Sequence, residues 1–250
     1  MLQMSLFALQ NIPDIKPGDD IGKIISDCMK REGFLLSDGD IVVVAHKIVS
    51  KAEGRLINLS QVEPSSKARQ LSEIVGKDPR LIELILQESE EIVKVRKGLI
   101  IARHRLGFVC ANAAIDQSNA GEGTAILLPE NPDESAKRIC KSIKEETGKN
   151  IAVIINDSHG RPFRQGAIGI AVGIWGIKPL LSYAGKRDRY GYTLRSSVEA
   201  IADELSSAAT LLMGQSNEGR PVVIIKGLSY EAGDGGVKSL IRSPKLDLFR

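Results

Sequence analysis

The stretch of sequence most informative about the fold is Ile151-Ala-Val-Ile-Ile155-Asn-Asp-Ser-His-Gly-Arg-Pro-Phe-Arg164. Its first five residues are apolar and mostly β-branched, which predicts a strand buried on both faces. The polar residues that follow are then expected to emerge where this strand ends. Further strands are predicted at 41–46, 92–96, 99–102, 124–128 and 221–225.

Helices alternate irregularly with these strands. Asn131-Pro-Asp-Glu134 predicts a capped helix start, and Gly148 predicts the end of that helix. Asp78-Pro79 predicts the start of another. A third helical face is predicted from apolar residues at steps of three and four, closed by Gly214: Leu194, Val198, Ile201, Leu205, Ala208 and Leu212.

Glycines interrupt the segment Gly166–Gly173, which predicts a strand packed closely against another backbone. Short turns with glycine between several strands favour antiparallel pairing. The sequence therefore predicts an α/β fold of the mixed α+β kind, with mixed, largely antiparallel sheets and flanking helices. We expect residues 1–250 to form a single unit, either as one intertwined body or as two interleaved lobes.

Composition excludes several classes of protein. Hydrophobic residues are 42% and charged residues 26% of the chain, as in ordinary globular proteins. A net charge of +3 and 4% aromatics do not suggest a nucleic-acid coat protein. The three cysteines, Cys28, Cys110 and Cys140, lie far apart and are expected to be small buried hydrophobes.

Membrane and nucleotide signatures are also missing from the sequence. The longest apolar stretch, Gly166–Ile177, contains four glycines and is too short to span a bilayer. The first ten residues lack the basic segment of a signal peptide, so a cytoplasmic protein is expected. No P-loop, dinucleotide fingerprint or H-E-x-x-H motif occurs.

The polar residues after the predicted strand 151–155 form the first candidate site. Asp157 and Ser158 offer hard oxygen ligands suited to Mg²⁺ or Mn²⁺, and Arg161 and Arg164 could stabilise phosphate charge beside such a metal. The alternative is a polar turn in which Asp157 caps Gly160 and the arginines are solvated.

A second candidate follows a near-apolar run that begins at Gly107. Asp116-Gln-Ser-Asn119 could supply another carboxylate ligand and an amide for a base or sugar. Its alternative is an Asx turn that closes a strand. Two aspartates converging on divalent metal are typical of phosphate-handling sites, although sequence alone does not show that Asp116 and Asp157 meet.

The basic loop Gly185–Tyr192 is the third candidate, because three bases in four positions suit a polyanionic substrate. A solvated charged face is its alternative. His159 could act as a base next to Asp157, or could be an ordinary turn histidine.

Four ordered motifs resemble those of the coenzyme F420-0:L-glutamate ligases, and the resemblance runs from about Phe7 to Gly227. They are Gly39–Arg55, Ala114–Asn119, Asn156–Arg164 and Gly214–Pro221. One departure is His46, which stands where the family pattern leads us to expect glutamine and should change the local hydrogen bonding.

The resemblance implies a GTP-dependent, amide-forming ligase that adds L-glutamate successively to F420-0. An acyl phosphate would be the intermediate, F420-1 and then γ-linked F420-2 the products, with GDP and phosphate released. F420-0, L-glutamate and GTP would be its small-molecule substrates, without nucleic acid or membrane. It also implies an intertwined homodimer.

The resemblance further implies two Mg²⁺ or Mn²⁺ sites and K⁺, whose ligands cannot be placed. Asp116 and Asp157 would hold one divalent ion, and Asp157, Ser158 and Gln215 would help to hold the second. The residues that would contact GTP are Leu9, Gln10, Asn11, Ile12, Ser37, Asp38, Lys47, Asn119, Met213, Gly214, Gln215, Ser216, Asn217, Glu218, Gly219 and Arg220.

With Asp116 and Asp157, we assign Arg161 and Arg164 to catalysis, on their charge beside the predicted metal site. Two other functions compete with the ligase: a metal-dependent phosphohydrolase that uses the same aspartates, and a GTP-binding regulatory protein without turnover.

Overall fold

The computed structural model describes residues 2–247. Its strands are β1 (Ser5–Ala8), β2 (Ile41–Ala45), β3 (Leu56–Asn58), β4 (Ser89–Arg96), β5 (Leu99–His104), β6 (Val109–Ala111), β7 (Thr124–Ile126), β8 (Ala152–Arg161), β9 (Arg164–Trp175), β10 (Leu181–Ser182), β11 (Val198–Glu199) and β12 (Val222–Lys226). Its α-helices are α1 (Ile21–Arg31), α2 (His46–Ala52), α3 (Ser66–Val75), α4 (Pro79–Gln87), α5 (Pro132–Thr147) and α6 (Ile201–Met213).

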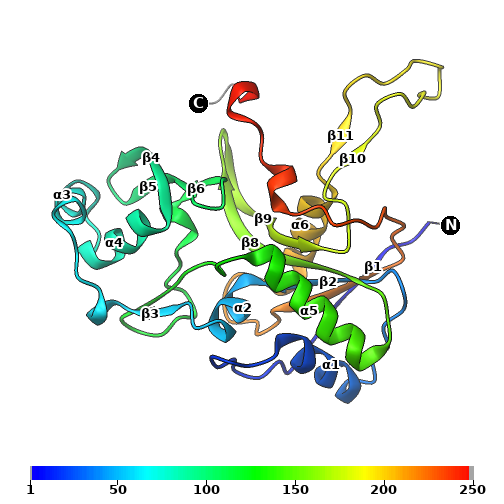
Figure 1. Cartoon of the computed structure of the whole chain (residues 1–250), viewed down its shortest axis with the longest axis horizontal. Helices are drawn as coiled ribbons and strands as arrows, with labels where there is room; N and C mark the ends of the chain where they lie inside the picture. The colour runs from blue at the N-terminus through cyan, green and yellow to red at the C-terminus, as the bar shows by residue number, and fades with distance from the viewer. Residues whose placement is uncertain (1, 248–250) are drawn as a thin grey trace.

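The main sheet within residues 2–247 has the strand order β1-β12-β2-β8-β9 (Figure 1). Only the pair β2–β8 is parallel there, and the other neighbours are antiparallel. This confirms the predicted mixed α/β architecture with largely antiparallel sheets.

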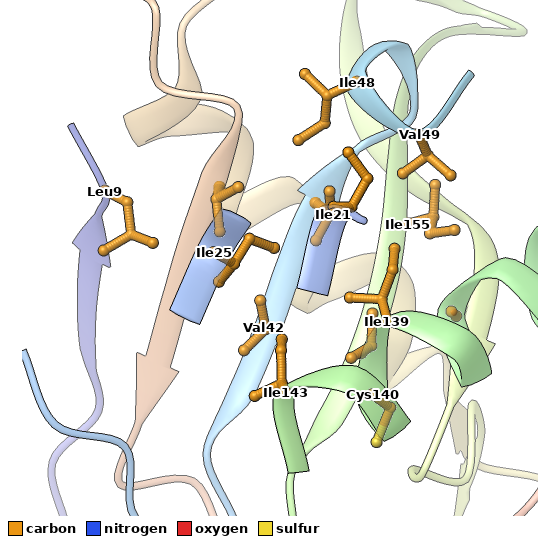
Figure 2. Packing of buried hydrophobic residues seen from close by; sticks show 14 of the residues in the cluster. Leu9, Ile21, Ile25, Val42, Ile48, Val49, Ile139, Cys140, Ile143 and Ile155 are labelled. Carbon is orange, nitrogen blue, oxygen red and sulfur yellow. The ribbon is translucent and has the colours of Figure 1, made fainter. Parts of the chain in front are cut away.

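Both faces of the main sheet are covered, and β2 and the first four residues of β8 are apolar at every position. Val42, Val44, Val153 and Ile155 face α1, α2 and α5, and Figure 2 shows this packing around Ile25 and Ile139 among others. The alternate residues of the same strands face α6. The period of two in a strand places successive side chains on opposite faces, so these runs are buried throughout.

A second group of elements lies beside the main sheet. It comprises α3, α4, the pair β3–β7 and the three-stranded sheet β4-β5-β6, shown in cyan and green in Figure 1. These elements enclose their own hydrophobic cluster, which includes Ile82, Ile85 and Ile100. In sequence, this group is inserted between α2 and α5, two helices that pack against the main sheet.

Local signals explain several helix ends. Asn131 Oδ1 accepts a hydrogen bond from Glu134 N at the start of α5, and Gly148 ends that helix with φ 71°. Asp78 likewise caps α4, where Pro79 takes the first helical position. The predicted starts of both helices and the predicted end of α5 are confirmed. All three cysteines are buried, as predicted.

The predicted helical face from Leu194 to Leu212 is wrong in its first part. α6 begins at Ile201, while Val198 lies in β11, and Leu194 donates its backbone N–H to Lys186 O. Cross-strand pairing in the β10–β11 arm, the long yellow extension in Figure 1, therefore overrides the helical spacing. The buried face of α6 is also shifted, to Ala202, Leu205, Ser206, Ala209 and Met213.

Close backbone packing along β9 is confirmed. A Cβ on Gly173 would lie 2.5 Å from the carbonyl oxygen of Pro132, and one on Gly169 would lie 2.4 Å from that of Ser206. Both values are below any ordinary contact distance, so β9 approaches the start of α5 and the middle of α6 only because these positions lack side chains.

Gly173→Ala is therefore expected to destabilise the protein by about 1–3 kcal/mol, because an overpacked core must shift its backbone. Gly160→Ala, on the paired strand, is the matched control, since a Cβ there meets nothing within 4 Å. We expect that variant to equal or slightly exceed the parent in stability. Urea denaturation midpoints measure both, and equal midpoints for the two variants would contradict the packing explanation.

No helix among the described residues is both long enough and apolar enough to cross a membrane.

Candidate functional site

The candidate site lies where the parallel strands β2 and β8 run side by side. Ala45 pairs with Asn156, so the next residues, His46 and Asp157, are brought together from distant parts of the sequence. We expected the polar residues after 155 to follow the end of a strand, and this is wrong. β8 continues to Arg161, and its polar half pairs with β9 beyond a shift in register after Ile155.

A cavity of about 410 Å³ opens at this point. Four segments line it: residues 12–15 after β1, the first turns of α2, the turn around Asp116, and the loop that follows α6. Asn156, Asp157 and Ser158 of β8 form part of its wall. Because β2, β8 and α6 belong to the packed core, much of the site rests on rigid elements.

The carboxylate of Asp157 is held between two imidazoles. His159 Nε2 lies 2.8 Å from Asp157 Oδ2, and His46 Nε2 lies 3.2 Å from Oδ1. Burial raises the pKa of Asp157, but the two histidines outweigh it and hold that pKa well below its usual range. Asp157 is therefore ionised at neutral pH, with only 12% of its side chain exposed.

The second aspartate, Asp116, forms an ion pair with Lys47, and both residues line the cavity. Asp116 Oδ2 lies 2.7 Å from Lys47 Nζ, and Ser118 N donates to Asp116 Oδ1 at 2.7 Å. The latter bond is the Asx turn considered above, so that turn exists, and its residues also line the cavity. Burial raises the pKa of Asp116, but Lys47 and Ser118 lower it by more, so the net pKa lies below its ordinary value.

The loop Met213–Arg220 forms the remaining wall. Gln215 Nε2 donates to Ser158 Oγ at 2.8 Å, and Asn119 Nδ2 donates to Ser216 O at 3.1 Å. These bonds tie the loop to β8 and to the turn at Asp116. Ser216 N donates to Glu218 Oε2 at 2.8 Å, so the loop already holds one carboxylate on a backbone amide. Amide groups of this kind also suit phosphate oxygens.

Most residues that the resemblance assigned to a site line this one cavity. They are Ile12, Lys47, Asp116, Asn119, Asp157, Ser158, Met213, Gly214, Gln215, Ser216, Asn217, Glu218, Gly219 and Arg220. The chain thus brings together Asp116 and Asp157, a convergence that the motifs alone left open.

Other assigned residues lie outside the cavity wall. Leu9 is buried in the core, and Gln10 and Asn11 are exposed beside it. Ser37 and Asp38 precede β2 at the end opposite the cavity, roughly 16 Å away for a five-residue strand. Arg161 and Arg164 flank the turn of the β8–β9 hairpin, which extends beyond the neighbouring strands in Figure 1. The basic loop Gly185–Tyr192 lies in the projecting arm, also apart from the cavity.

Sequence reasoning did not assign His46 or Lys51 to the site, yet both line the cavity. Lys51 follows Lys47 by four residues, a spacing that places both on one helical face, and this signal could have identified it. His46 stood out only as the one departure from the family motif, and its approach to Asp157 depends on the pairing of β2 with β8.

The donor set of the cavity fits a hard divalent cation. Within residues 2–247 there is no cluster of three or more His, Cys, Asp or Glu side chains able to hold a metal. Two carboxylates, a hydroxyl and a side-chain amide do belong to residues that line this one cavity: Asp116, Asp157, Ser158 and Gln215. Mg²⁺ is usually bound through one or two carboxylates together with substrate phosphates and water, and these residues match that pattern.

Comparison with known proteins gives a consistent match. A family model described as F420-0:Gamma-glutamyl ligase matches residues 10–227. A protein of Methanothermobacter thermautotrophicus named Coenzyme F420:L-glutamate ligase is 48% identical over 249 residues, which cover 99% of each chain. Proteins of the same name from Methanopyrus kandleri and Methanocaldococcus jannaschii are 45% and 46% identical, over 94% and 96% of this chain and 93% and 94% of theirs.

Proposed function

Because this chain belongs to the F420-0:gamma-glutamyl ligase family, we propose that it is a GTP-dependent, amide-forming ligase that adds L-glutamate successively to coenzyme F420-0. The products would be F420-1 and then γ-linked F420-2. The observation that carries the proposal is the single cavity in which Asp116 and Asp157 meet Lys47, Lys51 and the loop 213–220.

The chemical problem is that a carboxylate resists attack by an amine. In the proposed sequence, a carboxylate oxygen of F420-0 attacks the γ-phosphorus of GTP, and the bond from that phosphorus to the β-γ bridging oxygen breaks. GDP leaves, and an acyl phosphate remains. The glutamate nitrogen then attacks the acyl carbon, phosphate departs with its bonding electron pair, and the nitrogen loses a proton.

Phosphoryl transfer of this kind depends on positioning and on charge neutralisation rather than on a protein nucleophile. Lys47, Lys51 and Arg220 supply positive charge on the cavity wall, and the backbone amides of the loop suit phosphate oxygens. Asn119 is held against that loop by its bond to Ser216 O, where its remaining polar atoms could contact a base or sugar.

Mg²⁺ or Mn²⁺ would be held in two sites, one by Asp116 and Asp157, the other by Asp157, Ser158 and Gln215. Bound there, such ions supply charge neutralisation for the phosphates and align the reacting oxygens. K⁺ is part of the same proposal, without assigned ligands.

We also propose that the protein is a homodimer. Arg161 and Arg164 are proposed to bind the acidic substrates. Exposed aromatic side chains support the homodimer: Phe163 is 90% exposed at the turn of the β8–β9 hairpin, and Tyr190 is 94% exposed in the arm. Large exposed rings of this kind are typical of contact surfaces. We expect light scattering to give twice the mass of one chain, and a monomeric mass at micromolar concentration would contradict the dimer.

The deciding experiment is mass spectrometry of F420-0 incubated with the protein, GTP, Mn²⁺ and L-glutamate, with each component omitted in turn. We expect products heavier by one and two glutamyl units only when GTP and glutamate are both present. GDP and phosphate released from unchanged F420-0 would instead indicate a phosphohydrolase. GTP binding without any turnover would indicate a regulatory protein.

A further inference from the structure

Each oxygen of the Asp157 carboxylate faces a different histidine. His159 belongs to the same strand, two residues further on, so both side chains point to one face of β8. The ring of His159 packs against Phe108, with centroids 5.4 Å apart. His46 approaches from the neighbouring element, at the first position of α2.

His46 lines the cavity, yet its side chain is almost completely buried. Only 2% of it is exposed, and its Nδ1 lies 3.4 Å from Ser50 Oγ, one helical turn further on. Its Nε2 lies 3.2 Å from Asp157 Oδ1, yet it has no partner that satisfies hydrogen-bond geometry among the described residues. Since a buried polar atom left unpaired costs free energy, a small rotation of the carboxylate toward Nε2 would be favourable.

We propose that His46 is a positioning residue, which with His159 fixes the orientation of the Asp157 carboxylate toward the cavity. The inference rests on the proposed function in so far as Asp157 is a metal ligand. Nε2 of His46 faces the carboxylate and Nδ1 faces the Ser50 hydroxyl, so contacts at both ring nitrogens fix the ring. Groups that orient a metal ligand in this way affect affinity without touching the ion.

A matched pair of variants tests the proposal. The amide of His46→Gln ends near the position of Nε2, whereas that of His46→Asn ends near Nδ1 and cannot reach Asp157. We expect His46→Asn to raise the dissociation constant for Mn²⁺ by about 10–100-fold, and His46→Gln to remain close to the parent. Electron paramagnetic resonance titration of the full chain with Mn²⁺ and GTP measures both. If the two amides weaken binding equally, or neither does, His46 does not position Asp157.

The chain offers a control in its other buried histidine–carboxylate pair. His104 is fully buried, and its Nε2 lies 3.4 Å from Glu88 Oε2, outside the cavity. His104→Asn should lower the unfolding midpoint without changing the Mn²⁺ titration. Because His104 also stacks on Phe108, which packs against His159, a weakened titration in this control would show that lost packing alone weakens metal binding and would overturn the inference.

Crystal structures of the two His46 variants give a readout that does not depend on metal. We expect the Asp157 side chain to keep one rotamer in His46→Gln and to occupy more than one in His46→Asn. The same single rotamer in both would overturn the inference. Failure of the parent protein to bind Mn²⁺ would contradict the metal sites of the proposed function, and the rotamers would still decide the role of His46.

Discussion

Asp157→Asn is expected to abolish glutamate addition while the fold is retained. The substitution removes the negative charge that two imidazoles hold at the cavity wall, and it places an N–H₂ group against one of them. Loss of a charged ligand from a metal-assisted transfer costs several kcal/mol of transition-state stabilisation, which corresponds to at least about a 10³-fold fall in kcat. Product formation from F420-0, measured by mass spectrometry, tests this directly.

Asp203→Asn is the matched control for that variant. Asp203 is another carboxylate beside the β8–β9 hairpin, where it accepts a hydrogen bond from Ala171 N at 2.9 Å, and it does not line the cavity. An asparagine oxygen can accept the same bond, so ligation should continue. Both variants should unfold cooperatively near the parent temperature. Near-normal activity of Asp157→Asn would rule out the proposed metal ligation by this residue.

The parts of the fold that the sequence predicts well are those specified by local chemistry. The apolar runs at 41–45 and 152–155 lie in strands buried on both faces, and α5 begins at its capping asparagine and ends at Gly148. Leu194 and Val198 show the limit of such reasoning. Their helical spacing is genuine, but pairing within the β10–β11 arm determines their conformation.

The candidate site shows a different limit. Motif resemblance identified Asp116, Asp157 and the loop after α6, because these residues occur in recognisable local patterns. The approach of His46 to Asp157 follows from the parallel register of β2 and β8, and no local pattern encodes which strands become neighbours. The extended length of β2 likewise places Ser37 and Asp38 at its far end, although they stand only ten and nine residues before Lys47 in sequence.

Glu88→Gln is expected to destabilise the protein strongly, although Glu88 lies outside the site. Glu88 is 7% exposed and contacts three cationic or imidazole groups: Arg55 Nη2 at 2.8 Å, Arg105 Nε at 3.0 Å and His104 Nε2 at 3.4 Å. Arg55 also donates to Leu128 O, so the cluster joins α4 to the chain that returns to the main sheet. Removing the charge leaves the partly buried Arg55 and Arg105 without a counter-ion, which costs about 3 kcal/mol, the lower end of the loss for a buried pair.

The pH dependence separates this charge effect from lost packing. Burial raises the pKa of Glu88, but His104, Arg55 and Arg105 outweigh it and bring that pKa from 4.5 to about 2. A pKa lowered by folding stabilises the protein above the unfolded value, and here the gain of about 3 kcal/mol is lost as pH falls from 4.5 toward 2. Urea unfolding of parent and Glu88→Gln should therefore differ most at pH 7 and converge toward pH 3.

Glu63→Gln serves as the surface control. The Glu63 side chain pairs with Arg69 but is 93% exposed, so this variant should change stability little at any pH. A difference between parent and Glu88→Gln that stays constant from pH 7 to pH 3 would assign the loss to packing, since only the charged form of Glu88 can bind its cations more strongly than an amide does.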